Sequence, residues 1–131
     1  MSNLRTFARA ALALVTLASP ALAQSRTAGY HTAARLAASI DSVARANPQT
    51  VRVTTLATSP GGRPVQLVRI GNSDEKPALL VLAGAYGPQL ASSEVALRVV
   101  RTLASRPAAA ANNTIYIVPR LNPDASEAFF A

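Results

Sequence analysis

Two residues with polar side chains, Tyr86 and Gln89, lie three positions apart in a glycine-rich stretch. An apolar run over residues 78–83 precedes this stretch and has the length of a β-strand. In open α/β sheets, functional groups gather at the carboxyl ends of strands, so we expect both side chains at such an edge. A second polar segment, Asn122-Pro123-Asp124, follows the apolar run over residues 114–118.

Several other kinds of site lack the residues that they need. The chain has no cysteine and a single histidine, His31, which we interpret as a surface or core residue. Ser92 and Ser93 have no plausible histidine and acid partners for a serine nucleophile. Residues 84–87 lack the spacing and the lysine of a phosphate-binding loop. We expect Glu94 to lie in a first helical turn and to interact with the helix dipole there, rather than to act as a general base.

The charge of the chain gives no evidence for a nucleic-acid partner. The formal net charge is +7, but the arginines are scattered singly along the sequence. No aromatic residues alternate with them, as they do in a platform on which bases stack. We therefore interpret the charge as solvated surface and expect no nucleic-acid binding.

The first residues have the pattern of a secretory signal peptide. Arg5 and Arg9 precede an apolar stretch, and Ala21-Leu22-Ala23 offers a small-residue cleavage site. An uncleaved anchor is the weaker alternative, because the apolar run is shorter than the roughly 20 residues that span a bilayer. The sequence thus predicts a signal peptide over residues 1–23, a secreted or periplasmic protein, and no membrane contact after cleavage.

The remaining chain, residues 24–131, alternates between helical and strand patterns. Apolar residues at helical spacing predict a helix over residues 31–46. They predict a second helix from Ser92 or Ser93 to about residue 105. The apolar stripe of this second helix consists of Val95, Val99 and Leu103. Strand patterns cover residues 50–56 and 65–70, with a turn over residues 59–63 that predicts an antiparallel hairpin. The continuous apolar run at residues 78–83 predicts a strand buried on both faces. Residues 107–111 form a connector, residues 114–118 a fourth strand, and Asn122 begins a turn.

This order predicts an α/β fold with a mixed, largely parallel sheet flanked by helices. A strand, a helix and a second buried strand form a right-handed crossover whose strands run parallel. Two helices give little material to cover both faces of such a sheet. We therefore expect residues 24–131 to be the N-terminal portion of a larger domain.

The chain resembles the zinc carboxypeptidase family, the carboxypeptidase A-like metallopeptidases, over about residues 30–124. The resemblance rests on the order of the elements and on four short segments: Gly62-Arg63-Pro64, Leu82-Ala83-Gly84, Glu94 and Asn122-Pro123-Asp124. It implies a carboxypeptidase-like fold of the phosphorylase/hydrolase type and, in the family, a catalytic zinc. It also implies that Tyr86 and Gln89 occupy the positions of a His and a Glu that are zinc ligands in the family.

These two substitutions remove the metal chemistry that the resemblance implies. A catalytic zinc takes three protein ligands and leaves one position for water. A phenol with a pKa near 10 binds zinc poorly at neutral pH, and the amide of Gln89 has no charge. In the family, the third ligand, the general base and the arginines that bind a terminal carboxylate lie downstream of the matched segments. The family's glycine after Asn-Pro-Asp is Ala125 here.

Three functions remain open from the sequence. The first is a truncated, secreted carboxypeptidase-like protein without catalytic activity or zinc, and a variant of it is a pseudoenzyme that binds peptide or protein C-termini. The second is the N-terminal fragment of an active metallocarboxypeptidase that removes C-terminal residues from peptides. The third is a non-functional fragment. Substrate preference and oligomeric state do not follow from the sequence.

Overall fold

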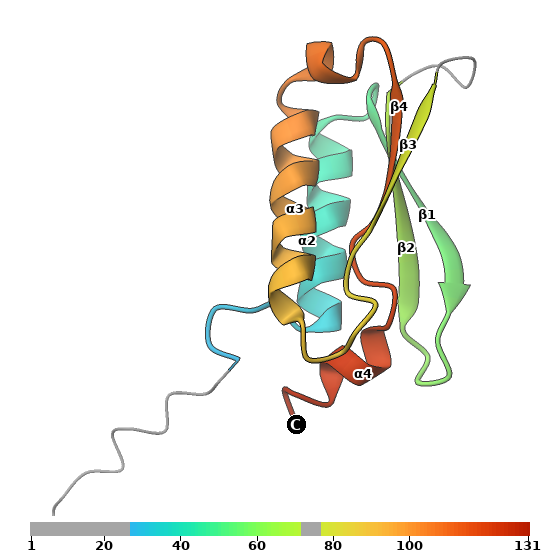
Figure 1. Cartoon of the computed structure of the whole chain (residues 1–131). Helices are drawn as coiled ribbons and strands as arrows, with labels where there is room; N and C mark the ends of the chain where they lie inside the picture. The colour runs from blue at the N-terminus through green and yellow to red at the C-terminus, as the bar shows by residue number, and fades with distance from the viewer. Residues whose placement is uncertain (1–26, 72–76) are drawn as a thin grey trace, which may run out of the picture.

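The computed structural model describes residues 27–71 and 77–131, so the predicted signal peptide and most of the polar loop before β3 lie outside the described residues. The described chain forms four strands, three α-helices and one short 3-10 helix (Figure 1). In chain order these elements are α2 (Ala33–Ala46), β1 (Val51–Thr58), β2 (Pro64–Ile70), β3 (Ala78–Leu82), α3 (Leu90–Ala104), η1 (Pro107–Ala110), β4 (Thr114–Val118) and α4 (Pro123–Glu127). The predicted helices and strands are all present; their ends shift by up to two residues, except that the N-cap of α3 is Gln89, three or four residues before the predicted caps. The expected connector contains η1.

The strands form one mixed sheet in the order β1-β2-β4-β3. The predicted hairpin is confirmed, because β1 pairs antiparallel with β2. Strand β4 pairs antiparallel with β2 and parallel with β3. The mixed α/β architecture is therefore as predicted, and the parallel part within the described residues is the β3-β4 pair.

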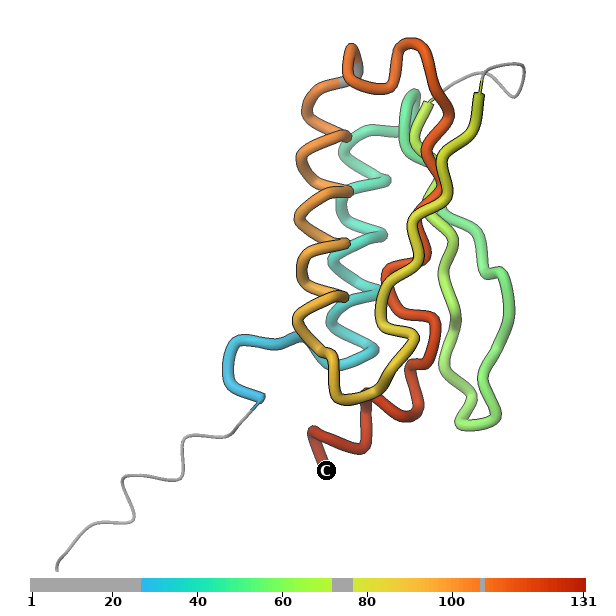
Figure 2. Tube along the Cα trace, viewed as in Figure 1, coloured from blue at the N-terminus to red at the C-terminus, as the bar shows by residue number. Residues whose placement is uncertain are grey.

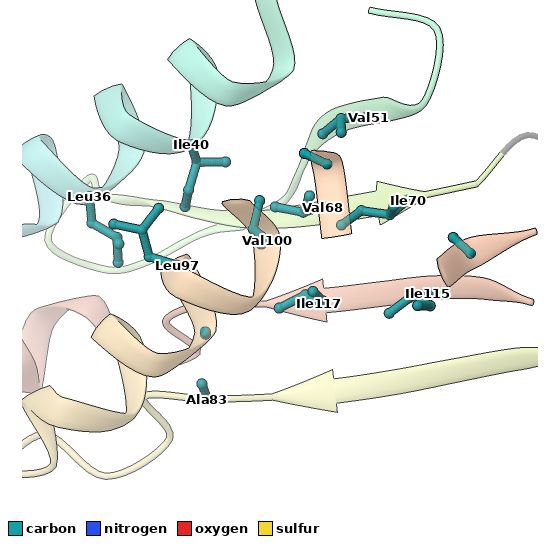
Figure 3. Packing of buried hydrophobic residues seen from close by; sticks show 13 residues of the cluster. Leu36, Ile40, Val51, Val68, Ile70, Ala83, Leu97, Val100, Ile115 and Ile117 are labelled. Atoms are coloured by element: carbon teal, nitrogen blue, oxygen red, sulfur yellow. The ribbon is translucent and has the colours of Figure 1, made fainter. Parts of the chain in front are cut away.

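Helices α2 and α3 lie side by side and cover one face of this sheet (Figure 1). Leu36 and Ile40 of α2, which the sequence placed on the buried stripe, point into the core. Figure 3 shows them beside Leu97 of α3, above Val68 and Ile117 of the sheet. The core thus forms between one helical layer and one sheet face.

The buried face of α3 is rotated about the helix axis relative to the predicted apolar stripe. Val95 is 62% exposed, whereas Leu97 and Val100 are fully buried and Val99 and Leu103 are only partly buried. The buried face also includes small residues, Ser93, Ala96 and Ala104. Sequence periodicity favoured Val95, whereas the packing of α3 on the sheet buries a face that mixes large and small side chains. The helix also begins at Leu90, before both predicted cap serines, and Gln89 occupies the N-cap position without a side-chain hydrogen bond.

Strand β3 is not buried on both faces. The prediction of a fully buried strand over residues 78–83 is therefore wrong. The strand forms an edge of the sheet in the described chain, and Leu79, Leu80 and Leu82 are 56%, 58% and 55% exposed. The physical reason is that the described helices cover one sheet face only and β3 has a strand neighbour on one side only. The described residues therefore leave part of the apolar surface of β3 exposed.

None of the helices within residues 27–71 and 77–131 is both long and apolar enough to cross a membrane.

The position of the buried face of α3 is testable by a pair of substitutions on that helix. Leu97→Ala removes a fully buried side chain and should lower the free energy of unfolding by about 2–5 kcal/mol. Val95→Ala alters an exposed side chain and should change it by less than about 0.5 kcal/mol. Urea unfolding followed by circular dichroism measures both. A larger loss for Val95→Ala than for Leu97→Ala would contradict the packing described above.

Candidate functional site

Tyr86 and Gln89 lie where the sequence predicted them, in the loop between the carboxyl end of β3 and the start of α3. Tyr86 is 64% exposed and Gln89 is also exposed. The backbone N–H of Gln89 donates to the carbonyl of Tyr86 at 3.0 Å, which closes a turn between them. Both side chains are therefore presented to solvent by a hydrogen-bonded loop.

This loop is held tightly at its glycines. Gly84 has a φ of +60°, and a Cβ built there would lie 2.7 Å from Ser93 Oγ and 2.9 Å from Arg120 Cα. A Cβ at Gly87 would lie 2.6 Å from the carbonyl oxygen of Ala125. The chain after β3 thus packs directly against the start of α3 and against the chain after β4, which Figure 2 shows returning beneath the sheet.

Ser92 ties the two ends of the loop together, in the first turn of α3 rather than at its cap. Its Oγ accepts from the N–H of Gly84 at 3.0 Å and donates to the carbonyl of Gln89 at 2.7 Å. The Ser92 hydroxyl therefore helps to fix the conformation of the loop.

Asn122, Pro123 and Asp124 begin a short helix, α4, where the sequence predicted a turn. Asn122 Oδ1 accepts from the N–H of Ala125 at 3.1 Å and caps the helix, and Pro123 is buried at its first position. Asparagine at the cap followed by proline at the first position is a favoured helix start. This sequence pattern could have identified the helix.

The carboxylate of Asp124 fastens α4 to the turn between β1 and β2. It accepts hydrogen bonds from Ser59 Oγ at 2.8 Å, from the N–H of Gly61 at 2.9 Å and from Arg63 Nη1 at 2.8 Å. The bond from the Gly61 N–H, and then those from Arg63 and Ser59, hold the pKa of Asp124 below its usual value. Asp124 is thus a structural joint between segments about 60 positions apart in sequence.

A second polar cluster was missed by the sequence analysis. His31 donates its backbone N–H to Glu94 Oε1 at 2.8 Å, and its Nδ1 lies 2.8 Å from Glu94 Oε2. Glu127 Oε2 accepts from the N–H of Ala33 at 2.8 Å, at the start of α2. The prediction that Glu94 lies in the first turn of its helix is wrong, because α3 begins at Leu90 and has no acidic residue there.

Arg120 joins this cluster from the chain after β4. It is only 4% exposed, and it donates from Nε to Ser93 Oγ at 3.1 Å and from Nη2 to the carbonyl of His31 at 3.0 Å. Burial lowers the pKa of Arg120, while the nearby carboxylates of Glu94 and Glu127 act in the opposite direction. An arginine still keeps its charge at neutral pH. The cluster therefore ties the start of α2 to α3 and to the C-terminal segment.

The residues at the loop do not fit a catalytic zinc. Within the part of the chain that the structure describes, no group of three or more His, Cys, Asp or Glu side chains could hold a metal ion. His31 and Glu94 are bonded to each other, and Tyr86 and Gln89 offer a phenol and a neutral amide. The donor set that zinc requires is not assembled from these residues.

The fold is that of the carboxypeptidases. Carboxypeptidase A from Helicoverpa armigera superposes with a TM-score of 0.72 at 20% identity, over 92% of this chain and 31% of its own. A metallo-carboxypeptidase from Burkholderia cenocepacia gives 0.66 at 24% identity, over 74% and 28%. Bovine thrombin-activatable fibrinolysis inhibitor, solved in complex with tick carboxypeptidase inhibitor, gives 0.67 at 17% identity, over 77% and 34%. The chain thus spans about a third of the length of these structures.

The model of the zinc carboxypeptidase family matches residues 36–130. The chain belongs to the zinc carboxypeptidase family, as the resemblance in its sequence indicated. No curated protein matches the sequence.

The joint at Asp124 predicts a pH dependence of stability. Because the folded-state pKa of Asp124 is depressed, its contribution is present above the unfolded pKa of about 3.9 and is lost as the pH falls through the folded value. Asp124→Asn should therefore lower the urea midpoint at pH 7, and the difference from wild type should shrink below about pH 3.9. Urea titrations across this range measure it. A difference that stays constant with pH would contradict the role of the charge.

The close approach at Gly84 predicts a contrast between two glycines. Gly62 also has a positive φ, but a Cβ there meets no atom within 4 Å. Gly62→Ala should cost about 1–2 kcal/mol from backbone strain alone. Gly84→Ala adds a steric clash and should cost more than about 3 kcal/mol. Thermal unfolding compares the two, and equal losses would show that Gly84 is required for its φ only.

Proposed function

We propose that this chain is a secreted carboxypeptidase-like protein that has no peptidase activity of its own. The observation that carries the proposal is the pair Tyr86 and Gln89 in the loop where the family's motif has a His and a Glu. The loop itself is well formed, so the framework that presents ligands is kept while the ligand chemistry is absent. The proposed signal peptide over residues 1–23 supports a secreted or periplasmic location.

The same substitutions support a chain that works without zinc. A carboxylate and an imidazole bind zinc strongly, whereas a protonated phenol and an amide do not. The described residues offer one histidine, and its Nδ1 is engaged with Glu94. Without the metal, nothing in the loop lowers the pKa of a water molecule or polarises a peptide carbonyl.

We further propose that residues 24–131 form the N-terminal portion of a longer carboxypeptidase-like domain. Three leucines of β3 are more than half exposed, and within residues 27–71 and 77–131 no strand pairs with the outer edge of β3. Long, apolar, exposed edges are avoided in soluble proteins, because they pair with other chains. Additional strands and helices on this side would bury these residues, and this chain covers only 34% and 31% of the length of two solved relatives.

A peptide-binding role without catalysis is a variant of this proposal. A groove beside Gln89 runs between the segment before α2, the start of α3 and the C-terminal residues, with Tyr30, Leu90 and Phe129 among its lining residues. Apolar and aromatic walls suit the side chains of a peptide. A peptide or protein C-terminus is the partner that the family suggests.

The second candidate function is that of an active metallocarboxypeptidase whose other ligands lie beyond residue 131. The family match and the partial coverage of the relatives favour it. It requires a downstream histidine, a general-base glutamate and a carboxylate-binding arginine. The genomic sequence past codon 131 would show whether these residues exist.

The zinc content of the purified protein distinguishes the two candidates. We expect the secreted protein to retain no stoichiometric zinc after dialysis and to release no C-terminal residues from peptides. The double variant Tyr86→His/Gln89→Glu restores two ligands and should bind zinc more tightly than wild type. Elemental analysis and a peptidase assay with and without a chelator measure this. Stoichiometric zinc in wild type, with hydrolysis that the chelator stops, would overturn the proposal and support the second candidate.

A further inference from the structure

Five arginines that are scattered in the sequence lie on the helical layer or directly after it. Two lie on α2 and two on α3, and the fifth follows α3 directly; they are Arg35, Arg45, Arg98, Arg101 and Arg106. All five are exposed. The two ion pairs found among the described residues, His31–Glu94 and Arg63–Asp124, involve none of them. We call these five residues the arginine face.

The acidic side chains of the described chain balance the arginine face only in part. Asp41 of α2 and Glu94 of α3 lie four positions before Arg45 and Arg98, where helical neighbours of opposite charge attract each other. Asp124 and Glu127 bind the hairpin turn and the start of α2. On α2, α3 and Arg106, five arginines thus stand against two carboxylates, which leaves an excess of three positive charges.

The arginine face extends over the outward sides of two neighbouring helices. Helices α2 and α3 lie side by side against the same side of the sheet, and their buried stripes point toward it (Figures 1 and 3). Their outward sides therefore form one surface. Between the arginines this surface exposes small and apolar side chains, which are Ala34, Ala38, Ala91 and Val95.

We propose that the arginine face docks on an anionic phospholipid bilayer. Guanidinium groups bind phosphate through paired hydrogen bonds, and a broad cationic surface with apolar residues between its charges matches a headgroup layer. Each arginine near an anionic membrane surface contributes about 1 kcal/mol of attraction. The secreted or periplasmic location proposed above would bring the protein to membrane surfaces.

A bilayer is favoured over a nucleic acid by the composition of the face. Neither α2 nor α3 contains an aromatic residue on which a base could stack. The inference does not depend on the zinc question. It is also compatible with a longer domain, because the exposed leucines of β3 lie on the sheet and not on the outward side of the helices.

Vesicle co-sedimentation tests the proposal. The secreted protein, with its N-terminus identified by intact mass, is mixed with phosphatidylcholine vesicles that contain or lack phosphatidylglycerol. We expect binding only with phosphatidylglycerol, and loss of binding in about 1 M salt, where charges are screened beyond roughly 3 Å. Arg98→Gln should weaken the partition about fivefold, and the double variant Arg98→Gln/Arg101→Gln about 25-fold.

Arg52→Gln is the matched control, because Arg52 is also exposed but lies on β1, away from the helical layer. It should change the partition less than about twofold, while Arg98→Lys should keep it within about twofold of wild type because the charge remains. Circular dichroism verifies that all variants are folded. Equal binding to vesicles without phosphatidylglycerol, or equal losses for Arg52→Gln and Arg98→Gln, would overturn the proposal. Tighter binding to duplex or single-stranded DNA with the same dependence on Arg98 would replace the bilayer with a nucleic acid.

Discussion

The close approach of the chain after β3 to the chain after β4 is the constraint on which the rest of the structure depends. Hydrogen bonds continue the parallel pairing beyond the strands: Ala83 N–H to Val118 O, Leu121 N–H to Ala83 O, and Asn122 N–H to Gly84 O, all between 2.8 and 2.9 Å. Only a glycine at position 84 permits this distance. As a result, the loop with Tyr86 and Gln89 is held beside the start of α4.

Most of the polar side chains at this edge hold backbone segments together. Asp124 binds the hairpin turn, Glu94 binds His31, and Arg120 binds both Ser93 and the His31 carbonyl. These contacts are made by protein groups alone. The scaffold of a metallopeptidase can therefore stay intact when the ligands in its loop are replaced, because ligand presentation and structural support rest on different residues.

The sequence predicted the elements and their order well, because hydrophobic periodicity and turn residues are local signals. It also placed Tyr86 and Gln89 correctly at the end of a strand. It failed for Val95, since apolar residues occur on more than one side of α3 and only the packing of the helix on the sheet decides which side is buried. It failed for β3, because an apolar run does not reveal how much of the surrounding chain is present to cover it.

The contacts of His31, Glu94 and Arg120 could not be predicted from local sequence patterns for a different reason. His31 and Glu94 are 63 positions apart and meet only after the helices pack. The gathering of the arginines has the same origin, because single charges that are far apart along the chain become neighbours when two helices lie in one layer. The sequence shows these arginines scattered singly, and only the fold shows that they share the helical layer.

The strand order also determines the sequence of events during synthesis. Strands β2 and β3 follow each other along the chain, yet β4 lies between them in the sheet. Until residues 114–118 leave the ribosome, β3 has no partner and β2 has only β1. Sheets that depend on such non-local pairing assemble slowly and keep apolar edges exposed in the meantime. Among the described strands, β4 is the last to be made and the one that joins β3 to β2, so a nascent chain that stalls before it would leave β3 unpaired and one edge of β2 open.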